Sequence, residues 1–139
     1  VGNHENYDDM STLRVDRIAH ITVLNERRKP LREIKGYQQQ RTFNVSQYVK
    51  EHIYMFGGES ITVTFKAKRS IVNQILDWFD GNVEFTNITA DNVVCRVRVN
   101  HDAFKYWALQ YMQSVKVLTP ASLVTEVKAA IEEGLHQYS

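Results

Sequence analysis

The sequence predicts an α+β fold for its C-terminal part, with the element order β-α-β-β-α-β-α from residue 59 onward. Apolar and polar residues alternate in four short segments, and apolar residues recur at helical spacing in three others. The composition, 43% hydrophobic and 24% charged, is typical of an ordinary globular protein. The first six elements match the split βαβ, or ferredoxin-like, arrangement βαββαβ, to which the sequence adds a C-terminal helix.

The first half of this region predicts a strand, a helix and a hairpin. Alternation over residues 59–68 indicates a half-buried strand. Residues 70–81 carry apolar side chains at helical spacing, with Ser70 placed as an N-cap and a glycine at the end. Residues 82–87 and 93–99 alternate again, which predicts two strands joined by a short connection.

Two helices and a strand complete the order. Residues 100–112 predict a helix capped by Asn100, and residues 114–118 a short strand. The last helix is expected to start with Thr119 as its cap and Pro120 in its first turn. Its apolar stripe consists of Leu123, Val127, Ile131 and Leu135.

The N-terminal part is less regular. Residues 1–24 hold a polar turn and then an alternating run that predicts a strand, broken near Arg17. Residues 25–44 are polar and predict a linker, and residues 45–56 a short helix. The helix is expected to bury Val45, Val49, Ile53 and Phe56. We therefore divide the chain into units 1–24, 25–58 and 59–139. Because it starts with Val rather than Met, we expect a fragment of a longer protein.

The predicted sheet leaves one face open, because right-handed crossovers place both helices on the other. Alternation turns Lys66, Arg96 and Arg98 to the open face, and Lys116 is expected to join them. Such a face suits an acidic ligand or a nucleic-acid backbone, although no aromatic residue stands there to stack bases. An interface with acidic residues elsewhere is an equally good interpretation.

A second basic surface is predicted in residues 27–41, which hold six basic residues and one acidic residue although the whole chain carries only +1. Arg27, Arg28 and Lys29 are possible anion contacts there. A solvated linker explains the same charges equally well.

No catalytic pattern stands out. The sequence has no glycine-rich phosphate loop, and no two of its five His residues lie at i, i+4 spacing. The single cysteine, Cys95, is interpreted as a small buried hydrophobe. We therefore expect a protein that is not an enzyme and has no metal or cofactor. No apolar run approaches a membrane span, and the N-terminus is unlike a signal peptide, so we expect a cytoplasmic protein without a membrane partner.

Several motifs resemble one family. They are R-x-D-R-I at Arg14–Ile18, NVSQYVKEHIYMFGGESITVTFKAK at 44–68, WALQY at 107–111 and VxVLxP at 115–120. In order and spacing they are similar to the C-terminal half of bacterial WYL-domain transcriptional regulators. The resemblance implies that residues 1–24 are the closing strands of an Sm-like β-barrel, the WYL domain. It also implies that residues 59–139 are the ferredoxin-like C-terminal extension.

The resemblance also implies a function. The chain would be the effector-sensing and oligomerising region of a DNA-binding regulator, with an anionic ligand or single-stranded nucleic acid as its effector. Arg14 and Arg17 match the arginines of the family pattern and would contact that ligand. Duplex DNA would be bound only through an N-terminal domain that is absent from this chain. A homodimer or higher homo-oligomer is expected, and an association module without a ligand is the alternative.

Overall fold

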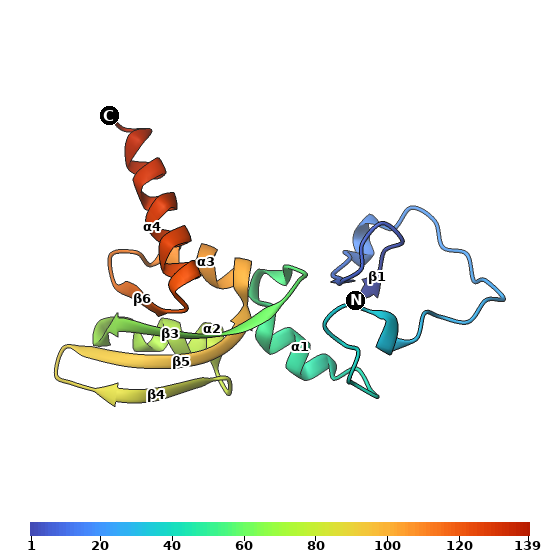
Figure 1. The fold of residues 1–139 in the computed structure, drawn as a ribbon, viewed down its shortest axis with the longest axis horizontal. Coiled ribbons are helices and arrows are strands. Elements are labelled where there is room, and N and C mark those ends of the chain that lie inside the picture. The colour runs from blue at the N-terminus through green and yellow to red at the C-terminus, as the bar shows by residue number, and fades with distance from the viewer.

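The structure, a computed structural model, describes residues 1–139. Its N-terminal elements are short (Figure 1). They are β1 (Gly2–Asn3), β2 (Met10–Ser11), the 3-10 helices η1 (Val15–Arg17) and η2 (Leu31–Glu33), α1 (Val45–Glu51) and the 3-10 helix η3 (Ile53–Met55). The C-terminal elements are β3 (Ser60–Lys68), the 3-10 helix η4 (Arg69–Ile71), α2 (Val72–Phe79), β4 (Val83–Ile88), β5 (Asn92–Asn100), α3 (His101–Gln110), β6 (Val115–Thr119) and α4 (Ala121–His136).

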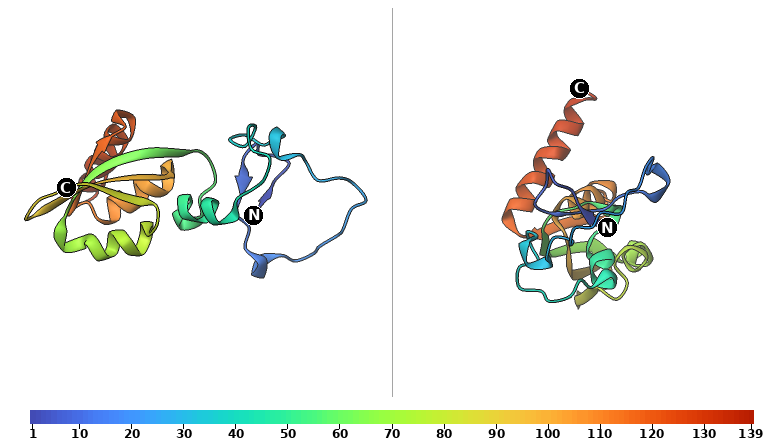
Figure 2. Two further views of the ribbon diagram at one scale, coloured as in Figure 1. Left: turned by 90° about the horizontal axis from the view of Figure 1, so that it is seen from below. Right: turned by 90° about the vertical axis from the view of Figure 1, so that its right-hand side faces the viewer.

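The C-terminal elements confirm the predicted fold class. Strands β3 to β6 form an antiparallel sheet in the order β4-β5-β3-β6, with the first and third strands of the fold at its centre. Helices α2 and α3 pack on one face of this sheet (Figures 1 and 2). This is the ferredoxin-like arrangement, and α4 is the additional C-terminal helix.

The core lies between the sheet and these two helices. Phe65 on β3 contacts Phe104 and Trp107 on α3, with ring centroids 5.2 and 5.4 Å apart, and Phe79 on α2 closes the cluster. The inward residues of β5, including Cys95, are fully buried beside them. Because a one-residue slip would turn these side chains to solvent, the core fixes the register that leaves the charged residues outside.

Helix caps are confirmed only in part. The Asn100 side chain accepts a hydrogen bond from the backbone N–H of Ala103 at 3.0 Å, as predicted for α3. Ser70 does not cap α2, because the chain forms η4 first and α2 starts after Ile71. Thr119 is the last residue of β6, so Pro120 takes the cap position of α4.

The predicted strand in residues 13–24 is wrong. This segment contains only η1, and its apolar residues, including Val15, Ile21 and Val23, are exposed. A strand needs a neighbouring chain to pair its backbone groups, and no other strand lies beside this segment. The only N-terminal strands are β1 and β2, which pair with each other over two residues each.

Helix α1 is confirmed, but of the four residues predicted to be buried on it only Ile53, which follows the helix in η3, is buried. Val45 and Val49 are exposed, and the helix buries Tyr48 and Glu51 instead. Helix α1 packs beside β5, at one end of the sheet. The buried face therefore consists of Tyr48, which packs on Phe43 and His52, and of Glu51, which pairs with Arg98 of the sheet.

Residues 52–58 bind the N-terminal part to the sheet domain. Tyr54, which has a φ of +59°, donates a hydrogen bond to Oε1 of Gln110 and packs on Trp78. Phe56 stacks on Tyr106, whose ring centroid lies 5.3 Å away, and the rest of the Tyr106 side chain is exposed. At Gly57 a side-chain Cβ would lie 2.8 Å from the carbonyl oxygen of Met10, so the close approach of β2 requires glycine.

Candidate functional site

The open face of the sheet carries the basic residues that the sequence placed there. Lys66, Arg96, Arg98 and Lys116 are exposed on the face opposite α2 and α3. In the strand register Arg98 lies opposite Thr62, Arg96 opposite Thr64, and Lys66 opposite Lys116. We call this set of four basic residues the basic face.

The basic face is largely free of neutralising partners. Lys68 extends it, two residues beyond Lys66 on the same strand. Glu84 lies opposite Arg96 in the register but forms no ion pair with it. Arg98 is the only member in an ion pair, so three of the four cations remain available to an anion.

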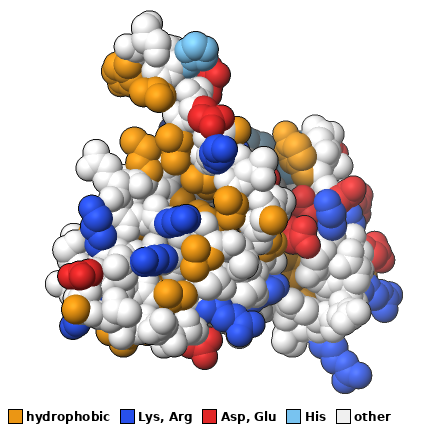
Figure 3. Space-filling view, turned by 60° about the vertical axis from the view of Figure 1, so that its left-hand side comes forward, with side chains coloured by type: hydrophobic (Ala, Val, Ile, Leu, Met, Phe, Trp, Pro, Cys, Tyr) orange, Lys and Arg blue, Asp and Glu red, His pale blue; other side chains and the backbone are white.

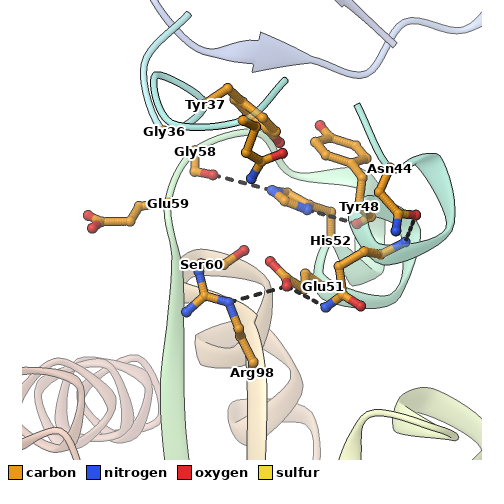
Figure 4. A pocket seen from close by; sticks show the side chains of 12 residues that line it. Gly36, Tyr37, Asn44, Tyr48, Glu51, His52, Gly58, Glu59, Ser60 and Arg98 are labelled. Atoms are coloured by element: carbon orange, nitrogen blue, oxygen red, sulfur yellow. Dashed lines mark hydrogen bonds and ion pairs between the residues drawn. The ribbon is translucent and has the colours of Figure 1, made fainter. Parts of the chain in front are cut away.

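Arg98 also reaches a cleft where α1 and residues 36–40 meet the sheet (Figure 4). Its Nε donates to Oε1 of Glu51 at 3.2 Å, and Nε2 of Gln47 donates to the same oxygen. The cleft encloses about 320 Å³ and is mostly polar. Its lining residues are Gly36, Tyr37, Gln40, Asn44, Gln47, Tyr48, Glu51, His52, Gly58, Glu59, Ser60 and Arg98.

His52 is buried at the back of this cleft. Its Nδ1 lies 2.8 Å from the carbonyl oxygen of Tyr48 and its Nε2 lies 3.2 Å from that of Gly58. Its ring also stacks on Tyr48, with centroids 3.9 Å apart. Since both ring nitrogens face backbone carbonyls, His52 is held as a structural bridge between α1 and the start of β3.

Burial also affects the hydroxyl groups of two further cleft residues, Tyr37 and Ser60. Desolvation raises the pKa of Tyr37 to about 12, with smaller contributions from Tyr48, Glu51 and Asp9, so its hydroxyl remains a hydrogen-bond donor at neutral pH. The Oγ of Ser60 is buried without a hydrogen-bond partner, so it forms no hydrogen bond with His52. The cleft therefore presents hydrogen-bonding groups around one ion pair, with no nucleophile activated by a base.

Arg14 and Arg17 lie away from the basic face. The segment that holds them is on the opposite side of α1 from the sheet in two perpendicular views (Figures 1 and 2). Arg14 makes a bidentate pair with Asp16, at 3.0 and 2.6 Å. This hydrogen-bonded pair raises the pKa of Arg14 and lowers the pKa of Asp16. Arg17 is exposed and forms no ion pair.

The basic stretch 27–41 is also separate from the sheet. Arg27, Arg28 and Lys29 are exposed, and Arg28 and Lys29 line a shallow hollow with β1 and Ile34. None of the six basic residues of the stretch forms an ion pair. The structure thus brings Lys66, Arg96 and Arg98 together and leaves Arg14, Arg17 and Arg27–Lys29 elsewhere.

Sequence reasoning missed the cleft. Its key residues Tyr48, Glu51 and His52 lie at i, i+3 and i+4, which is a common face of a helix. Hydrophobicity alone favours the other face of the helix, because Val45 and Val49 lie there. The missed signal was Glu51, the acidic residue of α1. Its only counter-ion is Arg98 on the open face of the sheet.

The comparison with protein families agrees with the fold. The family model of the WCX domain matches residues 58–135, which is more than half of the chain. The chain belongs to the WCX domain family, and the WCX domain is the C-terminal domain associated with WYL-domain regulators. This confirms the predicted family and gives the chain the class of a regulatory C-terminal module.

Two other findings complete the comparison. A search of curated proteins finds no match to this chain. None of the helices has the length and apolar character that crossing a bilayer requires.

Proposed function

We propose that the chain senses an anionic ligand on the basic face, with single-stranded nucleic acid as the leading ligand. The carrying observation is the gathering of Lys66, Arg96, Arg98 and Lys116 on one exposed sheet face, with only Arg98 ion-paired. A phosphate backbone neutralises such a face at several points. The absence of aromatic side chains there favours backbone contacts over base stacking.

The ion pair between Arg98 and Glu51 supplies a route for the signal. A phosphate that approaches the basic face competes with the Glu51 carboxylate for the guanidinium of Arg98. Glu51 is nine-tenths buried, so losing its cation is costly and shifts the balance between positions of α1. The N-terminal part, which is joined to the sheet through α1 and residues 52–58, would thereby respond to ligand on the sheet.

No catalytic step belongs to this proposal. Ser60, His52 and Glu51 line one cleft, but His52 bonds two backbone carbonyls and Glu51 bonds Arg98 and Gln47. A nucleophile, a base and an orienting group would have to bond one another in sequence to activate a hydroxyl.

Fluorescence anisotropy with a labelled single-stranded oligothymidine, over a range of salt concentrations, tests the proposal. Each phosphate that the protein neutralises on a single strand adds about 0.7 to the steepness of log Kobs against log salt. We therefore expect a slope shallower by about 1.4 for the double variant Arg96→Ala/Arg98→Ala. Removing two exposed charges elsewhere, in Arg69→Ala/Lys128→Ala, should leave the slope unchanged.

The alternative ligand surfaces are separated by the same assay. If Arg27→Ala/Arg28→Ala/Lys29→Ala removes binding and Arg96→Ala/Arg98→Ala does not, the basic stretch is the binding surface and the proposal for the sheet fails. A chain that binds no oligonucleotide even at low salt contradicts nucleic-acid sensing altogether. Association without a ligand would then be the remaining function.

A further inference from the structure

Helix α1 ends before its sequence requires it to end. Residues 45–56 carry apolar side chains at helical spacing and contain neither glycine nor proline, yet the helix stops at Glu51. Beyond it, Tyr54 and Met55 have φ values of +59° and +57°. The two glycines that come next are the residues that commonly end a helix. The sequence therefore has its own stop signal after the point where the helix ends in the structure.

The turn that follows α1 is strained. A left-handed backbone is unfavourable for a residue with a side chain, by an amount that shifts an equilibrium on the order of ten-fold. Tyr54 and Met55 adopt this conformation in succession. The hydroxyl of Tyr54 donates to Oε1 of Gln110, and its ring packs on Trp78 with centroids 4.8 Å apart. The Met55 side chain is 69% exposed, so the tertiary contacts of Tyr54 hold this turn.

A straight helix of the predicted length would bury a different face from the one that α1 buries. With about 100° between successive residues, four apolar side chains fall within about 80° of one another. They are Val45, Val49, Ile53 and Phe56. Ile53 belongs to the core cluster of the sheet domain, and Phe56 stacks on Tyr106. Continuing the helix through these two residues would turn Val45 and Val49, which are 57% and 62% exposed, toward the same domain.

Glu51 cannot face Arg98 in such a straight helix. It precedes Ile53 by two positions, which places the two side chains about 160° apart around the helix axis. With Ile53 toward the sheet domain, Glu51 points away from it, and its ion pair with Nε of Arg98 is broken. The kinked form in the structure buries Glu51, and the straight form buries the apolar stripe. The two forms of α1 therefore exclude each other.

We infer that residues 52–56 are a conformational switch, at which α1 lengthens from the kinked form to a straight helix that ends before Gly57. The ion pair of Glu51 with Arg98 and the hydrogen bond of Tyr54 hold the kinked form in the free chain. When α1 straightens, the N-terminal part that precedes it turns relative to the sheet domain. The switch thus connects the state of one ion pair to the arrangement of the two parts of the chain.

An anionic ligand acts on the first of these restraints. On the side of the molecule shown in Figure 3, Lys and Arg side chains lie over the sheet domain with few acidic side chains between them. A phosphate that binds the basic face competes with Glu51 for Arg98, a step that rests on the function proposed above. Glu51 then turns to solvent, and the strain at Tyr54 and Met55 is relieved in the helix. Ligand binding and lengthening of α1 therefore favour each other.

NMR couplings between the amide and Hα protons of the full chain test the switch, because they depend on φ. In the free chain Tyr54 and Met55 should have the couplings of a left-handed backbone. Glu51→Gln, which removes the charge that pairs with Arg98, should move both couplings to the smaller values of an α-helix without any ligand. A saturating single-stranded oligothymidine should do the same in the native chain. The control Asp16→Asn, which breaks an exposed ion pair, should change neither coupling.

Position 55 provides a matched pair of variants. Glycine accepts a left-handed φ and disfavours a helix, so Met55→Gly should hold the kinked form. Met55→Ala truncates the same side chain, but alanine retains the left-handed penalty and favours the helix. In the anisotropy assay Met55→Gly should therefore bind oligothymidine on the order of ten-fold more weakly than Met55→Ala. Because the Met55 side chain is exposed, neither variant alters the core.

The switch and the proposed function fail separately. Oligothymidine that binds without changing the couplings of Tyr54 and Met55 overturns the switch and leaves the basic face as the binding surface. Couplings that remain left-handed in Glu51→Gln, or equal binding by Met55→Gly and Met55→Ala, overturn the switch as well. A chain that binds no oligonucleotide but lengthens α1 in Glu51→Gln contradicts the proposed function and supports the switch.

Discussion

Residues 1–44 and residues 59–136 both contain alternating apolar residues, but these residues are buried only in the second region, where neighbouring strands and helices cover them. The core cluster of 17 buried residues runs from Ile53 to Val127 and includes nothing before residue 53. In residues 1–44 only Ile34 is buried, although this part also holds Leu, Val and Ile in alternating order. Alternation produces buried strands in the sheet and an exposed chain in the N-terminal part.

The difference lies in what each segment can pair with. Strand β3 has hydrogen-bonded neighbours on both sides, β5 and β6, and two helices cover its apolar face. Residues 13–24 have no neighbouring strand and no covering helix. Hydrophobic alternation therefore states how a segment can pair, and the rest of the chain decides whether it does.

The largest effect should come from the core of the sheet domain. Trp107→Ala should lower the free energy of unfolding by about 3–5 kcal/mol, because Trp107 fills the space between Phe65 and Phe79. Trp107→Phe should cost much less, since the indole N–H is buried without a partner and its removal offsets part of the lost volume. Urea unfolding followed by circular dichroism measures both. A loss for Trp107→Phe as large as that for Trp107→Ala would contradict the expectation that a ring at this position restores most of the packing.

The two asparagine caps provide a matched test of the two regions. Asn100 and Asn44 each accept a backbone N–H at 3.0 Å. Asn100 is buried and also donates to the carbonyl oxygens of Gly57 and Glu59, so Asn100→Ala should cost about 2 kcal/mol. Asn44 is exposed, so Asn44→Ala should cost about 0.5 kcal/mol. Thermal unfolding of the two variants measures both losses. Equal decreases in the melting temperature would contradict the difference that we expect from the burial of Asn100.

Much of the fold could be predicted from the sequence because its signals are local. The alternation of β3 and β5, the cap at Asn100 and the inward aromatic residues of α3 all depend on a few neighbouring residues. The predictions that failed depend on distant partners. Ser70 and Thr119 have the chemistry of caps, but η4 and β6 take up those residues first. Residues 13–24 have the pattern of a strand but lack a neighbouring strand to pair with.

The candidate site divides in the same way. The basic face follows from strand alternation and could be predicted from the sequence. The ion pair between Glu51 and Arg98 joins residues 47 positions apart in the sequence. A local sequence pattern cannot predict such a contact. The packing of α1 beside β5 also reverses which side of that helix is buried, so the cleft emerges only from the tertiary arrangement.

The Glu51–Arg98 pair and the Arg14–Asp16 pair test the two regions with like chemistry. Glu51→Gln should destabilise the protein by about 1 kcal/mol, less than for a fully buried pair, because the Arg98 side chain is 56% exposed. It should also strengthen oligonucleotide binding, since Arg98 gains a free charge. Asp16→Asn breaks an exposed pair and should change neither the melting temperature nor the binding. If Glu51→Gln weakens binding, the carboxylate holds Arg98 in place for the ligand rather than competing with it.

The smallest effect at neutral pH concerns Cys95, whose burial raises the pKa of its thiol from 9.0 to about 11. Above pH 9 the unfolded chain loses this proton first, so the contribution of Cys95 to stability is complete below pH 9 and declines as the pH rises to 11. Urea unfolding across this range should show a steeper decline for the native chain than for Cys95→Ala. Tyr37, with a pKa raised to about 12, is present in both proteins and cancels in the comparison.

The same thiol also reports on the contrast between the two regions. Below pH 9 a thiol-specific reagent should label Cys95 only as fast as the sheet domain opens, because the reactive thiolate is both scarce and covered. Tryptic cleavage after the exposed Arg27 or Arg28 should therefore proceed without any increase in labelling. If cleavage there accelerates labelling of Cys95, the N-terminal part contributes to the stability of the sheet domain, and the two regions are less independent than their burial indicates.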